Sequence, residues 1–390
     1  MGEVVHASKI LNIRYASAGL TAVVIGYTGS VIIIIQAAMA AGATTEQITS
    51  WLLALGIAMG VTSIGFSLRY KIPVLMAWST PGAAMLIGVV DQYDLTVSIG
   101  AFVMTGLMIA LTGCFKPVSR MIQSIPQPMA TAMLAAIVLP FCMNAFLPAE
   151  SDFRIFVVML AAFLLAKRWL PKYVMILLLL AGLGIALWDG VFAAKSLKLT
   201  LATPVLVYPE FTLSGFINIS IPLYLVTMLS QNLPGMAMLR SYNYSLPLPQ
   251  ILIGSGVTNA MLAPIGGFSV NLAAISAAAC MNEDVDADPS LRYRSTIWAG
   301  LFYLLAGVWA TAVVTLFLAL PEAIGQMMAG FAVLGTLLMC LQNAFNDARY
   351  HEAALITFLV TVSGVTLFGI GSTLWGLVVG GLFYLNKKKH

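Results

Sequence analysis

The chain contains an apolar stretch of membrane-spanning length that is interrupted by Ser-Thr-Pro-Gly at residues 79–82. The whole stretch, residues 73–90, reads PVLMAWSTPGAAMLIGVV. Proline is tolerated in the first turn of a helix but not in its interior. We therefore expect residues 73–78 to be extended and residues 80–90 to form a half-helix that begins in the middle of the membrane. Non-helical backbone survives at that depth only where it is buried in protein or lines a cavity.

A similar interruption lies in the second half of the chain. Residues 264–271 read PIGGFSVN and lead into a short apolar run at residues 272–280. A half-helix N-terminus presents N–H groups and a partial positive charge, and secondary transporters place such termini at their substrate sites. The two interruptions therefore predict a pair of broken spans around one site.

The composition is that of a polytopic helical membrane protein, because 60% of the 390 residues are hydrophobic and 9% are charged. The net charge of +4 requires no nucleic-acid partner, since membrane topology accounts for where the basic residues stand. No cleaved leader is expected before the first span. The four cysteines and three histidines are scattered without metal-ligand spacing, so we expect no metal, no cofactor and no disulfide.

The apolar runs predict an all-α fold of fourteen spans in two sets of seven. Residues 13–190 would form the first repeat (spans 1–7) and residues 213–386 the second (spans 8–14), with a polar boundary loop at residues 189–212. Because seven is odd, the second repeat is expected to lie inverted, with the substrate site at the repeat interface. An Asn-Ala-Phe triplet ends both span 5 and span 12, at residues 144–146 and 343–345, which supports an internal repeat.

The basic residues support this layout. With both termini in the cytoplasm, all of the 19 Lys and Arg residues except Arg154, Lys195 and Lys198 fall on the cytoplasmic side, in keeping with the positive-inside rule. The chain is therefore predicted to be a multi-pass protein of the inner (plasma) membrane.

The expected site is neutral and polar. Every Asp and Glu lies at a span end or in a loop of this layout, so the buried carboxylate that usually relays protons is missing. Helix N-termini, amides and hydroxyls suit an anion, and aromatic or thioether side chains suit a ring, so we expect a small aromatic carboxylate as substrate. The candidate substrate-binding residues are Tyr27, Gln36, Trp78, Ser79, Thr80, Met228, Gln231, Asn232, Phe268, Ser269 and Asn271.

Other interpretations of these residues remain open. Gln36 is equally suited to a hydrogen bond between helices, and Tyr27 and Trp78 are suited to packing. An intramembrane enzyme would require a nucleophile–base pair or a metal cluster, and the sequence suggests neither, so we expect no enzyme. A purely structural membrane protein would not require two broken helices.

Several stretches resemble the benzoate:proton symporter family, and they are spread over nearly the whole chain. The most specific is AWSTPGAA at residues 77–84. The others are Gly26-Tyr27, QAA at 36–38 with AGATT at 41–45, LVTM at 225–228 with SQN at 230–232, and GIGS at 369–372 with WG at 375–376.

This resemblance implies a fold similar to the uracil-type nucleobase transporters and the sulfate/bicarbonate anion exchangers. That fold has seven plus seven inverted spans, with a core of spans 1–4 and 8–11 and a gate of spans 5–7 and 12–14. It also implies proton-coupled import of benzoate or a similar aromatic carboxylate across the lipid bilayer, by alternating access. Homologues of this fold often dimerise, which makes a homodimer a further expectation.

One departure concerns the proton. Nucleobase members of the wider fold carry glutamates in spans 8 and 10, whereas this chain has Gln231, Asn232 and Asn271 in the corresponding regions. The proton could travel on the substrate, whose carboxyl pKa would rise in a dry pocket, or on an edge acid, Asp91 or Asp94. The alternative function is a transporter, exchanger or channel for another organic or inorganic anion, or for a nucleobase, without proton coupling.

Overall fold

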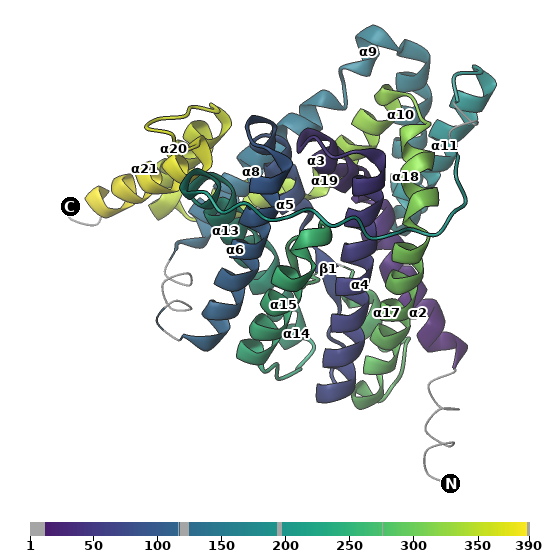
Figure 1. Ribbon diagram of the computed structural model, residues 1–390, viewed down its shortest axis with the longest axis horizontal. Helices are drawn as coiled ribbons and strands as arrows, with labels where there is room; N and C mark the ends of the chain where they lie inside the picture. Colours follow the sequence, from purple (N-terminus) through teal and green to yellow (C-terminus); the bar gives the residue numbers. More distant parts are fainter. Residues whose placement is uncertain (1–11, 116, 118–124, 193–196, 275, 388–390) are drawn as a thin grey trace.

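The computed structural model of the chain describes residues 12–115, 117, 125–192, 197–274 and 276–387. Within these ranges the structure is helical apart from one two-stranded ribbon in its centre (Figure 1). Some of the basic residues that support the predicted orientation lie outside the described residues: Lys9, Lys116, Arg120, Lys388 and Lys389. Lys195, one of the three exceptions, also lies outside them.

The first half of the chain begins with a bent helix and ends with a helical hairpin. Its elements are α2 (Ile13–Thr28), α3 (Val31–Ala40), α4 (Thr45–Tyr70), β1 (Met76–Trp78), α5 (Thr80–Ile87), η1 (Val90–Gln92), α6 (Leu95–Cys114), α8 (Gln127–Asn144), α9 (Pro148–Ser151), α10 (Phe153–Trp169), η2 (Pro171–Tyr173) and α11 (Val174–Trp188).

The second half begins with a long helix that contains two π-helical turns, η4 and η5. Its elements are α12 (Leu213–Gly215), η4 (Phe216–Ser220), α13 (Ile221–Thr227), η5 (Met228–Asn232), α14 (Leu233–Ser241), α15 (Leu248–Leu262), η6 (Ala263–Ile265), β2 (Val270–Leu272), α16 (Ala278–Met281), η7 (Pro289–Leu291), α17 (Tyr293–Val308), α18 (Ala310–Leu318), α19 (Glu322–Ala344), η8 (Ala348–Tyr350), α20 (His351–Val362) and α21 (Ser372–Lys387).

The prediction of fourteen spans is wrong. In the described ranges, eight helices are long and apolar enough to cross a membrane, or nine if α17 and α18, which meet at a 62° bend, count as one span. A helix rises 1.5 Å per residue, so a span needs about 20 residues. Several of the expected spans are shorter: α10 has 17 residues, α20 has 12 and α16 has 4.

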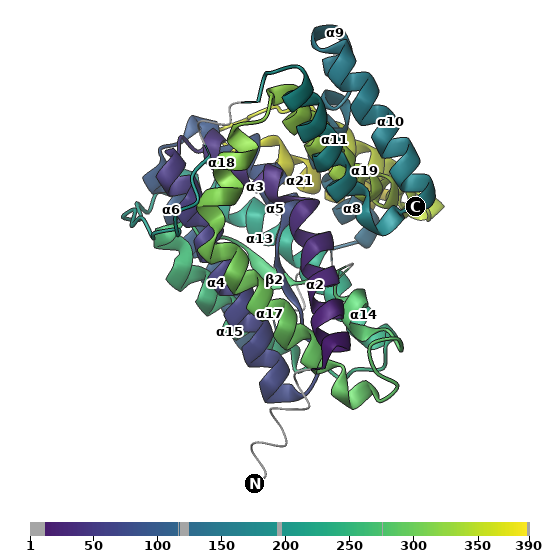
Figure 2. The same cartoon turned by 90° about the vertical axis from the view of Figure 1, so that its right-hand side faces the viewer.

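The helices form two groups (Figure 2). The ribbon group consists of α2–α6 and α12–α18 with both strands, and the flanking group consists of α8–α11 and α19–α21. In the ribbon group α4 packs on α17 and α6 on α15, and in the flanking group α8 packs on α19 and on α20. The groups touch where α5 and η5 meet α8, where α3 meets α19, and where α2 meets α11.

Glycines allow the closest helix contact. Gly56 and Gly60, four residues apart on α4, face Gly307 and Gly300 on α17. A Cβ added to Gly56 would lie 2.6 Å from the Gly307 Cα, so only glycine fits at this crossing. This contact fixes how α4 and α17 pack beside the ribbon.

The ribbon joins the two interrupted stretches. β1 and β2 pair antiparallel, with Met76 opposite Leu272, Ala77 opposite Asn271 and Trp78 opposite Val270. The first interruption has the expected form, since β1 leads directly into α5, although α5 ends at Ile87 rather than at residue 90. The second expected half-helix is wrong: helix α16 begins only at Ala278, separated from β2, and has four residues.

Candidate functional site

Two asparagines hold β2 in place through its backbone. The Asn259 side chain of α15 accepts a hydrogen bond from the Val270 N–H at 2.8 Å and donates one to the Val270 carbonyl at 2.9 Å. The Asn232 Oδ1 accepts from the Leu272 N–H at 3.1 Å. Both amides are buried. They give the short strand the partners that a wider sheet would otherwise supply.

The N-terminus of α5 is capped by its own chain. The Ser79 Oγ accepts a hydrogen bond from the Gly82 N–H at 2.9 Å, and the Ser79 N–H donates to the Ser269 carbonyl at 3.0 Å. Pro81 has no N–H. The half-helix α5 therefore offers fewer free N–H groups than expected, although the positive end of its dipole still points at the ribbon. Thr80, at the first position of α5, is half-buried.

Ser269 occupies a strained position where the chain enters β2. Its φ is 46°, in the left-handed region that non-glycine residues rarely adopt. The hydroxyls of Ser269 and Thr227 are hydrogen-bonded to each other, which ties this turn to α13. Backbone strain of this kind is often found at functional sites.

Tyr27 and Trp78 form an aromatic pair at the break between α2 and α3. Their ring centroids are 4.9 Å apart, and the Trp78 Nε1 donates to the Ser30 Oγ at 2.7 Å. The Tyr27 hydroxyl is buried and has no hydrogen-bond partner among the described residues. An unpaired buried hydroxyl costs free energy, so it is a candidate donor to a ligand.

Asn271 provides an unpaired acceptor on the ribbon. Its Nδ2 donates to the Ser269 carbonyl at 2.7 Å, which fixes the orientation of the amide. Its Oδ1 is fully buried and has no donor among the described residues. The site therefore contains one unused donor, on Tyr27, and one unused acceptor, on Asn271.

The two glutamines lie where the two helix groups meet. Gln36 is half-buried on α3, and its Nε2 lies 4.0 Å from the position that a Cβ on Gly325 of α19 would occupy. Gln231 is half-buried on η5, which contacts α8. Both residues are placed where a movement of one group against the other would change their surroundings.

The three apolar side chains expected to contact the ring of the substrate, those of Trp78, Met228 and Phe268, do not lie together. The Phe268 ring is fully buried between Trp51, at a centroid distance of 5.7 Å, and Phe102, at 5.3 Å. Met228 belongs to a separate small cluster on α13, α6 and α15, where its Sδ lies 3.3 Å from the Asn232 Nδ2. Of the side chains of Trp78, Met228 and Phe268, only that of Trp78 forms a ring contact with Tyr27 among the described residues.

Sequence reasoning missed three residues around this site. A Cβ on Gly26 would lie 3.3 Å from the Tyr303 hydroxyl and 3.6 Å from Ser276, so both side chains lie beside Gly26, the residue before Tyr27. Asn259 was also missed, although a mid-span amide is the same signal that singled out Asn232. In the described ranges no group of three His, Cys, Asp or Glu residues is placed to hold a metal ion.

The family model of the benzoate membrane transport protein matches residues 10–385 of the chain. The inner membrane protein YdcO of Escherichia coli (strain K12) is 40% identical over 368 residues, which cover 94% of each chain. The benzoate membrane transport protein of Acinetobacter baylyi (strain ATCC 33305 / BD413 / ADP1) is 35% identical over 367 residues, covering 94% of this chain and 93% of that one. The matching family is one of membrane transporters and not of enzymes, as expected.

Solved structures share the fold at low identity. SLC26A9 matches with a TM-score of 0.64 and 12% identity, over 96% of this chain and 65% of that one, so this chain spans just under two thirds of its length. The transmembrane domain of the cyanobacterial bicarbonate transporter BicA matches with a TM-score of 0.59 and 14% identity, over 94% and 97%. The expected uracil-transporter-like arrangement of seven plus seven spans is therefore corrected to an SLC26- and BicA-type fold.

Proposed function

Because the chain belongs to the benzoate membrane transport protein family, we propose that it carries benzoate, or a closely related aromatic carboxylate, across the bacterial inner membrane. The relative with the printed function of benzoate transport aligns over nearly the full length of both chains. A second relative is named as an inner membrane protein, which supports the proposed location.

Similarity over nearly the full length to a benzoate membrane transport protein carries this proposal, and two unpaired buried polar atoms near the ribbon are candidate substrate contacts. A protonated carboxyl group has one oxygen that accepts a hydrogen bond and one O–H that donates. The Tyr27 hydroxyl is a buried donor and the Asn271 Oδ1 a buried acceptor, each without a partner among the described residues, so each is a candidate contact for a carboxyl group. The Trp78 ring beside Tyr27 offers a flat apolar surface to an aromatic substrate.

We propose that the proton travels on the substrate. Desolvation disfavours the charged form of a carboxylic acid and raises its pKa, so a dry site takes up the neutral acid. The competing carriers, Asp91 in η1 and Asp94 before α6, are both exposed, away from the buried ribbon. Proton-coupled uptake that survives replacement of each by Asn would favour the substrate-borne proton.

We propose alternating access between the two helix groups, with the ribbon group as the core and the flanking group as the gate. Gln36 and Gln231 stand at the contacts between the groups, so a sliding movement would expose the ribbon to one side and then to the other. Cytoplasmic termini follow from the charge bias and belong to the same proposal.

A second candidate is exchange or facilitated passage of an anion without a proton. The lack of a carboxylate among the candidate site residues favours it, because such a site has no acidic side chain of its own to relay a proton near neutral pH. SLC26A9 and BicA share the fold, but likeness at this level of identity says nothing of the substrate.

Uptake of labelled benzoate into proteoliposomes separates the two candidates. The signal of empty liposomes is subtracted, because neutral benzoic acid crosses bilayers unaided. Accumulation that follows an inward proton gradient and collapses with an uncoupler would support proton symport. Saturable exchange that ignores the gradient would support the second candidate. The absence of any protein-dependent signal would refute benzoate as the substrate.

A further inference from the structure

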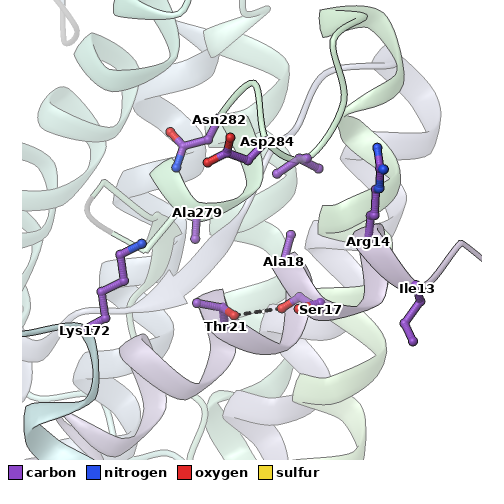
Figure 3. A pocket seen from close by; sticks show the side chains of 10 residues that line it. Ile13, Arg14, Ser17, Ala18, Thr21, Lys172, Ala279, Asn282 and Asp284 are labelled. Atoms are coloured by element: carbon purple, nitrogen blue, oxygen red, sulfur yellow. Dashed lines mark hydrogen bonds between the residues drawn. The ribbon is translucent and has the colours of Figure 1, made fainter. Parts of the chain in front are cut away.

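A cavity of about 450 Å³ lies at the end of α2 away from the ribbon (Figure 3). It is bounded by the first turns of α2, by the segment that follows α16, and by η2. The polar side chains of its lining include Arg14, Ser17, Lys172, Asn282 and Asp284. Its volume lies within the range of small-molecule sites.

The cavity carries a net positive charge. Lys172 and Arg14 approach it from opposite sides, with Asn282 and Asp284 between them (Figure 3). Neither cation forms an ion pair with another described residue. With two cations and one carboxylate, the lining attracts an anion, while Asp284 limits how tightly the anion is held.

The cavity also lies on the seam between the two helix groups. α2 and the segment after α16 belong to the ribbon group, whereas Lys172 comes from η2, between α10 and α11 of the flanking group. Farther along the same seam, Met175 of α11 lies 3.7 Å from the position of a Cβ on Gly29, which stands between Tyr27 and Ser30 in the sequence. The seam between α2 and α11 therefore borders both the cavity and the proposed transport site.

One wall of the cavity is held rigidly. The Arg292 side chain donates to the Asp286 carbonyl at 2.8 Å and to the Met281 carbonyl at 2.7 Å. The Tyr15 hydroxyl donates to the Asp286 carboxylate at 2.5 Å. These bonds fix both ends of the segment that carries Asn282 and Asp284, so the wall is preorganised.

We infer that this cavity is a vestibule on the cytoplasmic side of the transport path, where Arg14 and Lys172 bind the carboxylate of the substrate on its passage between the ribbon and the cytoplasm. The inference rests on the proposed function for the identity of the anion. Apolar side chains, among them Ile13 and Val285, offer the ring a surface, while weak binding allows the anion to leave again.

Charge substitutions test the vestibule. The measurement is the KM of benzoate transport, with benzoate supplied from the side of the membrane on which Arg14 lies. Removing one cation that lies about 5 Å from the anion in a solvated site weakens the binding constant by about four-fold. K172Q and R14Q should each raise KM by about that factor with little change in kcat, whereas D284N should lower KM. The differences should shrink at high salt. R168Q, on α10 outside the lining, is the matched control.

Thiol protection tests occupancy directly, with a readout independent of transport. In a Cys114→Ser background, S17C is labelled with a membrane-impermeant charged thiol reagent, because the other cysteines are buried. Millimolar benzoate should slow labelling of S17C, and benzamide, which lacks the charge, should not. S17C with K172Q should lose the protection.

The outcomes separate the inference from the proposed function. Equal KM values in K172Q, R14Q and D284N, together with unprotected S17C, would overturn the vestibule even if the wild type accumulates benzoate. Protection by benzoate without wild-type uptake would uphold the vestibule and refute benzoate transport. Labelling that depends on anionic lipid in the liposomes and not on benzoate would assign the cavity to a lipid headgroup and overturn the inference.

Discussion

Asn259→Ala removes the strongest side-chain attachment of the central ribbon. The Asn259 amide makes two hydrogen bonds to Val270, at 2.8 and 2.9 Å, and both residues are buried. The substitution leaves the Val270 N–H and carbonyl without these partners, at about 1–3 kcal/mol for each unsatisfied group. We expect a loss of about 3 kcal/mol, which is about a 100-fold fall in the ratio of folded to unfolded protein.

Reversible unfolding in mixed detergent micelles measures this loss, with benzoate binding followed in the same samples. The matched control is Thr258→Ala, because the Thr258 hydroxyl bonds only to the Gly254 carbonyl of its own helix, at 2.8 Å. The control should change stability by less than about 0.5 kcal/mol. If Asn259→Ala is as stable as the control, the ribbon does not depend on this amide and the reasoning is refuted.

Three further predictions follow from single contacts. Tyr27→Phe should raise stability slightly, since it removes a buried hydroxyl that has no partner among the described residues. It should also weaken benzoate binding about 10-fold by calorimetry, and unchanged affinity would remove Tyr27 from the site. Gly56→Ala should destabilise the protein by about 1–3 kcal/mol because of the contact with α17. Gly65→Ala is the control and should stabilise the protein slightly, because a Cβ at Gly65 would have no neighbouring atom within 4 Å. Equal effects of the two substitutions in unfolding titrations would contradict this packing. The hydrogen bond from Tyr15 holds the pKa of the Asp286 carboxyl below its ordinary value of 3.8. The bond therefore stabilises the folded protein above that pH, and this stabilisation is lost as the pH falls through the lowered pKa. Asp286→Asn should reduce the fall in melting temperature between about pH 5 and pH 3, and an unchanged profile would argue against the bond.

The outcome for the candidate residues shows where sequence reasoning holds. The break at residues 79–82 was predicted because its cause is local: proline lacks an N–H and fits only the first helical turn. The glycine spacing on α4 was likewise visible, but its partner helix α17 was not, since nothing in the spacing names the facing surface.

The span count failed because helix length and bending depend on packing. α16 stops after four residues and α17 bends by 62° into α18, and apolar composition alone does not reveal such ends. The assignment of Asn232 illustrates the same limit. The sequence indicated a costly mid-span amide, but only the fold shows that its Oδ1 accepts the Leu272 N–H.

The sequence by itself determined that this chain is a helical membrane protein with broken elements near its centre, because hydropathy and proline geometry act over a few neighbouring residues. Its family followed from motifs spread along the whole chain. Only the tertiary structure decided which polar groups remain unpaired. Whether the Tyr27 hydroxyl or the Asn271 Oδ1 has a partner depends on residues far away in the sequence, and that pairing sets the cost of burying each group.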